Sequence, residues 1–165
     1  MTSLRLLVLT MLTVSACAAG PKMLGNSQIQ DTPFSRGVIE TIETYRTALE
    51  RQDAKALLLM ASKDYREDSG TPTGSDDYGY DGLRQVLAER LGKVREVRYA
   101  VRYVAMRSNC GGVAKRGCKA AVEAIVDASF TVKDAMGNDR RPDKRDQSEF
   151  VLQWSGDKWL FLSGM

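Results

Sequence analysis

The chain has 165 residues, of which 43% are hydrophobic and 27% are charged, so it can form one domain with a substantial core. Its 24 lysines and arginines outnumber its 21 aspartates and glutamates by only 3, and this small, scattered excess argues against a nucleic-acid partner. The sequence contains no histidine, which removes the most common general base and the most common metal ligand. We therefore expect no metal site and no cofactor.

The first 16 residues have the features of an export signal. Arg5 precedes a short apolar run, which is too short for a permanent membrane span, and small residues follow at Ser15 and Ala16. The tetrapeptide VSAC, which ends at Cys17, resembles the lipobox of bacterial lipoproteins. This resemblance implies cleavage before Cys17, lipidation of its thiol and acylation of the new amino terminus. The alternative is an ordinary signal peptide that is cut near Ala19.

The residues after the lipobox bear on location and domain boundaries. Ala18 stands where lipoproteins held in the inner membrane of enteric bacteria tend to have aspartate, so the resemblance favours the outer membrane, with the domain in the periplasm. The stretch 18–31 is rich in small and polar residues and has no apolar periodicity, which predicts a flexible tether. The expected parts are a signal peptide at 1–16, a lipidated tether at 17–31 and a folded domain at 32–165.

The remaining cysteines, Cys110 and Cys118, form an even pair in a chain that we expect in an oxidising compartment. They bracket the glycine-rich and basic segment GGVAKRG. Two thiols without histidine seldom bind a metal, so the alternatives are a disulfide or free thiols, and we expect the disulfide. Closing this short loop would contribute about 2.6 kcal/mol in the chain-entropy estimate.

Two helices are predicted at the start of the folded domain. Thr32 or Asp31 can cap the first helix, and apolar residues then recur at helical spacing as far as Leu49. Asp53 follows a break in this pattern and can cap a second, short helix that ends at Met60.

Most of the second half of the chain alternates apolar and polar residues, which predicts strands. A polar stretch with a short strand near Tyr65 comes first, and a third helix is predicted over 81–93. Residues 94–107 alternate with a slip that indicates a bulge, and residues 118–133 alternate cleanly. The remaining expected segments are a charged hairpin loop at 134–146 and strands at 147–154 and 158–164.

This order of elements, and the segment VIETIETYRTALERQDAKALLLMASKDYRED, resemble the NTF2-like superfamily, which includes ketosteroid isomerases and SnoaL-like polyketide cyclases. The helix lengths, the break at Asp53 and the entry to the third helix at 81–83 carry the resemblance. It implies an α+β cone, in which three N-terminal helices pack in a curved, mainly antiparallel sheet with a four-strand C-terminal meander. The open end of such a cone can hold a small molecule.

The same resemblance suggests a catalytic pair. Tyr45 precedes Asp53 by the spacing at which related isomerases place an oxyanion donor, and Asp68 approximately matches their aspartate base, with one residue of uncertainty. A buried phenol beside a carboxylate can stabilise an enolate while the carboxylate moves a proton. The pattern is incomplete, because Phe150 stands where those isomerases have a third group, an acid, and the neighbouring Glu149 points to the other face of the strand. The simpler interpretation is that Tyr45 packs in the core and Asp68 belongs to a solvated rim.

Three function classes remain open. The cone can bind an apolar small molecule or lipid, and for this class we expect the lining to include Tyr45, Tyr99, Tyr103 and Trp154. The open face of the sheet can instead bind an envelope protein or a second copy of the chain, so that the protein is a monomer or a homodimer. The third class is an isomerase or cyclase-like enzyme that uses Tyr45 and Asp68. We expect the first or second class, with no catalysis and with the membrane contacted through the acyl chains.

Overall fold

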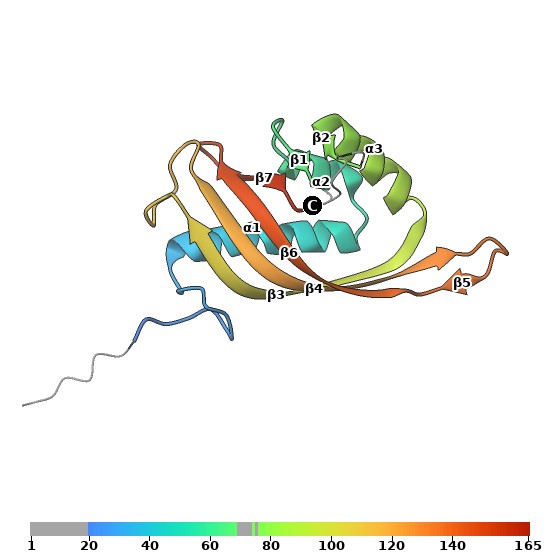
Figure 1. Ribbon diagram of the computed structural model, residues 1–165, viewed down its shortest axis with the longest axis horizontal. Coiled ribbons are helices and arrows are strands. Elements are labelled where there is room, and N and C mark those ends of the chain that lie inside the picture. The colour runs from blue at the N-terminus through green and yellow to red at the C-terminus, as the bar shows by residue number, and fades with distance from the viewer. Residues whose placement is uncertain (1–19, 69–73, 75) are drawn as a thin grey trace, which may run out of the picture.

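The computed structural model describes residues 20–68, 74 and 76–165 (Figure 1). Cys17 and the signal peptide expected before it lie outside the described residues, so the lipobox stays a prediction. No helix in the described part of the chain is long and apolar enough to cross a membrane.

Helix α1 spans Pro33–Glu50 and lies at the centre of the domain, with one apolar side. Of the two candidate caps, Thr32 is the one used: its side chain accepts a hydrogen bond from the Ser35 N–H, and the Ser35 hydroxyl accepts one from the Thr32 N–H. The buried stripe of α1 recurs at helical spacing and includes Val38, Ile42, Tyr45 and Ala48. It faces the sheet.

Two short helices and a short hairpin close the other side of α1. Helix α2 spans Ala54–Met60 and is capped by Asp53, whose carboxylate accepts a hydrogen bond from the Ala56 N–H at 2.9 Å. Strands β1 (Arg66–Glu67) and β2 (Tyr78–Gly79) pair antiparallel, and helix α3 follows directly over Tyr80–Leu91. The expected strand near Tyr65 is thus β1.

The main sheet is a meander in the order β3-β4-β6-β7, with β5 paired to β4. Figure 1 shows its long strands bending around α1, with α2 and α3 over the open side of the curve. Two register shifts interrupt β3, between Arg95 and Arg98 and between Tyr103 and Ala105, where the sequence indicates a slip. The strands span Val94–Ser108 (β3), Lys119–Lys133 (β4), Asp139–Arg140 (β5), Asp143–Trp154 (β6) and Trp159–Ser163 (β7).

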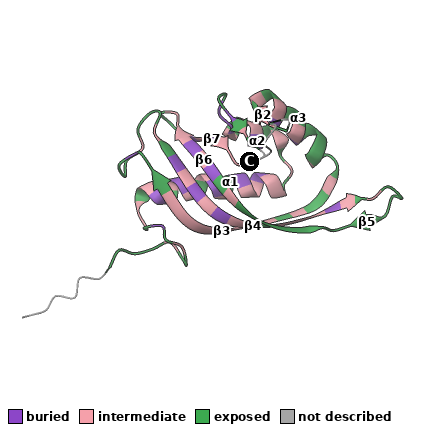
Figure 2. Cartoon of the chain, in the orientation of Figure 1, coloured by how far each residue is buried: buried purple, intermediate pink, exposed green. Residues whose placement is uncertain are grey.

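The concave face of the sheet and the buried stripe of α1 form one core. On β4 the even-numbered residues from Ala120 to Val126 are buried, and their partners Leu152 and Phe150 on β6 lie fully inside. Figure 2 shows this buried patch at the centre of the curved sheet and along α1. The alternation expected for β4 is therefore confirmed from Ala120 to Ala128, where the even-numbered side chains face α1. Beyond Ala128 the strand extends past the helices (Figure 1).

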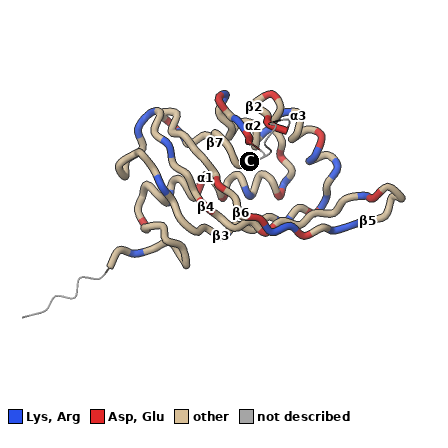
Figure 3. The backbone as a smooth tube through the Cα atoms, viewed as in Figure 1, with Lys and Arg blue, Asp and Glu red and all other residues tan. Residues whose placement is uncertain are grey.

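The hairpin between β4 and β6 differs from the expected loop at 134–146. Strands β5 and β6 extend into this segment, and the turn itself is short: the Asp134 carboxylate accepts hydrogen bonds from the N–H groups of Met136 and Asn138. The hairpin is held by the backbone pairing of β4 with β5 and β6, and its side-chain contacts are ion pairs such as that of Lys133 with Asp139 at 3.0 Å. Figure 3 shows both signs of charge along this projecting arm. An apolar alternation pattern cannot reveal a strand whose side chains are all polar.

The fold also begins earlier than residue 32. Ile29 is buried, and the Gln28 N–H donates a hydrogen bond to the Val104 carbonyl on β3 at 2.7 Å. Met23 and Gln30 form an isolated antiparallel bridge. This part of the segment expected as tether is therefore packed on the domain, because one buried isoleucine and the free edge of β3 give it partners.

The predicted disulfide is present between Cys110 and Cys118, whose Cα atoms lie 5.2 Å apart. It closes the connection between β3 and β4. Cys110 is itself buried in the core cluster, so the bond ties this connection to the end of the sheet.

Candidate functional site

A cavity of about 370 Å³ lies between α1, α3 and the concave face of the sheet. This volume is within the range of small-molecule sites in proteins. Its described lining is mainly apolar and aromatic, with a few charged or hydroxyl groups: Tyr45, Leu49, Tyr78, Leu83, Val86, Leu87, Arg90, Leu91, Tyr99, Val126, Ala128, Lys144, Asp146, Ser148 and Met165.

Tyr45 forms the inner end of this cavity. Its ring centroid lies 5.2 Å from that of Phe161 and 6.0 Å from that of Phe150, both on the sheet, and 5.9 Å from that of Tyr99. Burial raises the pKa of Tyr45 well above its ordinary value, and the charge and hydrogen bond of the Tyr99 hydroxyl raise it further. The Tyr45 hydroxyl therefore stays protonated.

A carboxylate lies beside this pair, and it belongs to Glu67. The Tyr65 hydroxyl donates to Glu67 Oε2 at 2.5 Å, and the Gly164 N–H donates to the same oxygen at 2.9 Å. Glu67 also contributes to the raised pKa of Tyr45, because its negative charge opposes ionisation of the phenol. Burial, followed by the hydrogen bond to Glu67, raises the pKa of Tyr65.

Gly164 is needed for this arrangement. Its φ is 89°, which favours glycine, and a Cβ at this position would clash with the carbonyl oxygen of Glu149 on β6. The chain can therefore pass close to β6 and direct the Gly164 N–H towards Glu67.

Asp68, the expected base, lies one residue further along. It lines a second cavity of about 660 Å³ together with Glu67, Tyr99 and Ser148. Since Tyr99 and Ser148 line both cavities, the two are neighbours. Strand β1 ends at Glu67, whose carboxylate contacts the Tyr65 hydroxyl, and Asp68 follows it on the wall of the same second cavity.

Two of the aromatic candidates serve other contacts. The Tyr103 hydroxyl donates to Glu43 on α1 at 2.5 Å, which joins β3 to the helix. Trp154 packs edge to face on Trp159 with ring centroids 5.4 Å apart. Neither residue is among the described lining of the cavity between α1 and α3. Of the four expected ligand-contacting residues, the structure brings Tyr45 and Tyr99 together.

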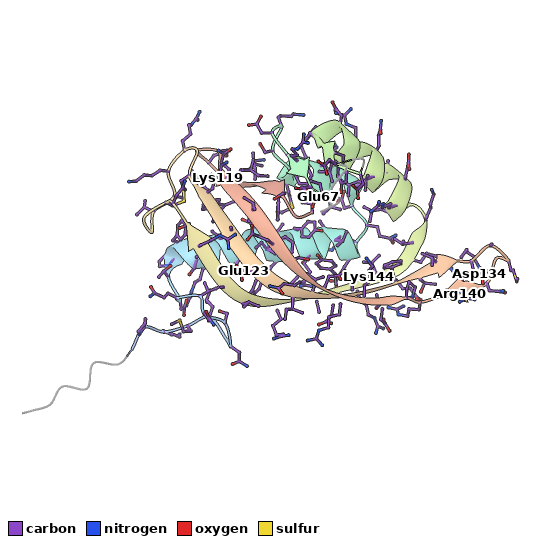
Figure 4. All side chains as sticks on the ribbon, in the orientation of Figure 1. Glu67, Lys119, Glu123, Asp134, Arg140 and Lys144 are labelled. Carbon is purple, nitrogen blue, oxygen red and sulfur yellow. A yellow bond between two sulfur atoms is a disulfide. The ribbon has the colours of Figure 1, made fainter. Side chains whose placement is uncertain are left out.

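The mouth of the cavity carries the charged groups that sequence analysis did not single out. Arg90 comes from the last turn of α3, and Lys144 and Asp146 come from the inner face of β6. Figure 4 places Glu67 near β1 and Lys144 near the part of the sheet that faces α3. Lys144 lies in the segment that the sequence predicts as a loop. Without a predicted strand there, the sequence could not indicate that its side chain lies on the inner face of the sheet.

The outer face of the sheet is polar in this region. Arg107 on β3 pairs with Glu123 on β4 at 2.8 Å and also with Glu149 on β6. Glu149 is therefore engaged outside the cone and does not supply the acid that related isomerases have near Phe150. Within the described ranges, no group of three or more Cys, Asp or Glu side chains could hold a metal ion.

The chain resembles known proteins in its fold and not in its sequence. No family model and no curated protein sequence matches. A ketosteroid isomerase-like protein from Erwinia carotovora atroseptica superposes with a TM-score of 0.56 and 19% identity, covering 78% of this chain and 90% of that one. A protein described as a dehydratase of the NTF2-like family from Streptomyces avermitilis gives a TM-score of 0.60 and 13% identity, covering 79% and 92%.

A third structure, described as a scytalone dehydratase from Novosphingobium aromaticivorans, has a TM-score of 0.58 and 16% identity over 78% of this chain and 79% of that one. At such low identities the similarity concerns the fold and not the activity. The helix order, the curved antiparallel sheet and these neighbours together show that the chain has the NTF2-like α+β cone fold.

Proposed function

We propose that this chain is an envelope lipoprotein whose cone binds a small apolar molecule without converting it. The observation that supports binding is the apolar cavity of about 370 Å³, whose inner end is made by the tyrosine pair Tyr45 and Tyr99. The proposal of an envelope location rests on the lipobox at Cys17 and on the disulfide, which is typical of oxidising compartments.

The contacts at the inner end favour binding over catalysis. The Tyr45 ring packs edge to face on the Tyr99 ring, and the Glu67 carboxylate already accepts two hydrogen bonds. These groups are suited to contact a polar atom of a ligand and to keep the inner end fixed.

Filling the cavity tests this proposal. Ala128 lines it from β4, so Ala128→Trp should occupy the space and weaken binding of the neutral dye Nile red at least about tenfold. Ala121→Trp is the matched control, because Ala121 lies on the opposite face of the same strand and pairs with Arg107 and Val151. Fluorescence titration measures the Kd, and thermal unfolding shows whether each variant is folded.

If Ala128→Trp does not fold, Val86→Trp on α3 fills the same cavity from the helix side. Equal dye binding by the wild type and by a folded, filled variant would contradict binding inside the cone.

The alternative is an enzyme that uses Tyr45 with Asp68 or Glu67. The observation that favours it is the closeness of a buried phenol and a carboxylate at one end of a cavity. It requires turnover of an enolisable ketone or a lactone, which Asp68→Asn or Glu67→Gln would abolish because an amide cannot take the proton. We expect the wild type to show no turnover across such a panel.

A further inference from the structure

The charged side chains that line the cavity lie at its mouth. Glu67, whose negative charge acts on the Tyr45 hydroxyl, lines the neighbouring cavity of about 660 Å³. At the mouth, Arg90 projects from α3, and Lys144 lies on the strand across from it. The charged groups of this cavity therefore gather at its mouth, and the lining behind them is mainly apolar and aromatic.

Arg90 is available to a ligand. Its guanidinium forms no hydrogen bond or ion pair with another residue in the part of the chain that the structure describes, whereas its backbone carbonyl is engaged at the end of α3. Its positive charge acts on the nearby Tyr78 phenol, where it partly offsets the rise in pKa that burial causes. The guanidinium thus lies beside an aromatic wall of the cavity, and it can donate two parallel hydrogen bonds to an anion.

Lys144 is only weakly engaged. Its Nζ lies 3.7 Å from Asp146 Oδ2, and both side chains are mostly exposed, at 73% and 62%. An exposed pair at this distance contributes little and exchanges readily for another partner. Two cations against one carboxylate leave the mouth with a net positive charge of one, opposite an apolar interior.

We propose that the ligand of the cone is a single-chain carboxylate, with its apolar body in the cavity and its anionic head between Arg90 and Lys144. This inference rests on the proposed binding function and adds the chemical class and the orientation of the ligand. The reversed orientation is disfavoured, because it would place the anionic head among the apolar and aromatic residues of the inner end and leave the two cations without a partner.

The test compares three probes that share one chain length and differ only in the head. Dodecanoate, dodecanol and dodecyltrimethylammonium are used below the concentrations at which they aggregate, and each displaces Nile red from the wild type. Dodecanoate should bind about tenfold more tightly than dodecanol, and the cationic probe should bind most weakly. Raising the salt from about 0.05 to about 0.5 M should reduce the preference for dodecanoate.

Variants of Arg90 and Lys144 then test whether the preference for dodecanoate arises at the mouth of the cavity. Arg90→Gln and Lys144→Gln should each weaken dodecanoate about three- to tenfold and change dodecanol by less than about twofold. Arg84→Gln is the matched control on α3, because Arg84 pairs with Asp81 at 2.9 Å and is not part of the described lining. It should leave all three affinities unchanged.

The outcomes separate this inference from the proposed function. If Nile red binding is blocked by Ala128→Trp but the three probes bind equally, the cone binds apolar molecules and the proposed head group is wrong. If Ala128→Trp does not block the dye, the binding function itself fails. An undiminished preference for dodecanoate in Arg90→Gln and Lys144→Gln would overturn the assignment of the head to the mouth.

Discussion

Asp31 is held between two cations ahead of α1, although its sequence position suggests only a cap. Arg36 contacts it with Nε at 2.5 Å and Nη2 at 2.9 Å, and Lys22 Nζ lies 3.3 Å away. The hydrogen bond from Arg36, with the help of Lys22, lowers the pKa of this carboxyl to about 2. The ionised form is therefore favoured in the folded protein.

This lowered pKa gives a pH prediction. A carboxyl with a lower pKa in the folded than in the unfolded state stabilises the fold above the unfolded value of about 4, and this contribution is lost as the pH falls towards 2. Asp31→Asn should therefore flatten the decrease of the free energy of unfolding between about pH 4 and pH 2. Urea denaturation followed by circular dichroism across this range measures it, and Asp143→Asn on the exposed hairpin is the control. Parallel curves for the wild type and Asp31→Asn would contradict the prediction.

The neighbouring carboxylates Glu67 and Asp68 show how far residue-level prediction reaches. Helical periodicity over eighteen residues placed Tyr45 on the buried stripe of α1, because many positions agree on one face. Strand β1 has two residues, so no alternation is long enough to say which acidic side chain points inward. Arg90 and Lys144 were missed for a similar reason, because the spacing of charged residues in a sequence does not show which of them lie beside a cavity.

Among the elements, those with apolar periodicity were predicted and those held by polar contacts were not. The caps and breaks around α1 and α2 follow from Thr32 and Asp53, whose side chains accept N–H bonds at helix starts. The segment 134–146 was expected as a loop, because its strands carry polar side chains, some of them in ion pairs such as that of Arg141 with Glu96, and so show no apolar alternation. Ile29 was likewise too isolated in the sequence to reveal that its segment is packed on the sheet.

The disulfide is the element-level feature that mutation can test. Replacing both cysteines in Cys110→Ala/Cys118→Ala should lower the free energy of unfolding by about 2 to 5 kcal/mol, because the loop is freed in the unfolded chain and Cys110 leaves space in the core. The fold should persist, since the meander and helices do not depend on this connection. Urea denaturation measures the loss, with far-UV circular dichroism to show that the fold is kept.

Reduction provides the control for this prediction. A reductant should lower the stability of the wild type towards that of the double variant and should leave the variant unchanged. Peptide mapping without reductant should find the two cysteines linked, and free thiols at both positions in exported protein would contradict the bond in the cell.

For the whole molecule, the fold was predictable although no family model matches the sequence. Three helices followed by a meander, without alternating strand and helix units, leave few ways to cover one curved sheet. Figure 1 shows that the described chain starts at the end of the molecule opposite the projecting β4–β6 hairpin. An anchor at Cys17 would therefore hold the starting end near the membrane and leave that hairpin at the far end.

The anchor itself is the prediction that decides where this molecule works. Cys17→Ser removes the thiol that the lipobox would lipidate, so the variant should lose labelled palmitate and leave the membrane fraction. Each buried methylene contributes about 0.8 kcal/mol, so the loss of several acyl chains cannot be replaced by weak contacts of the domain. Cell fractionation and metabolic labelling measure both effects, with the Cys110→Ala/Cys118→Ala variant as a control that keeps Cys17. Mass spectrometry of the mature amino terminus separates the alternatives: an acylated Cys17 supports the anchor, whereas an unmodified start after Ala19 would show an ordinary signal peptide.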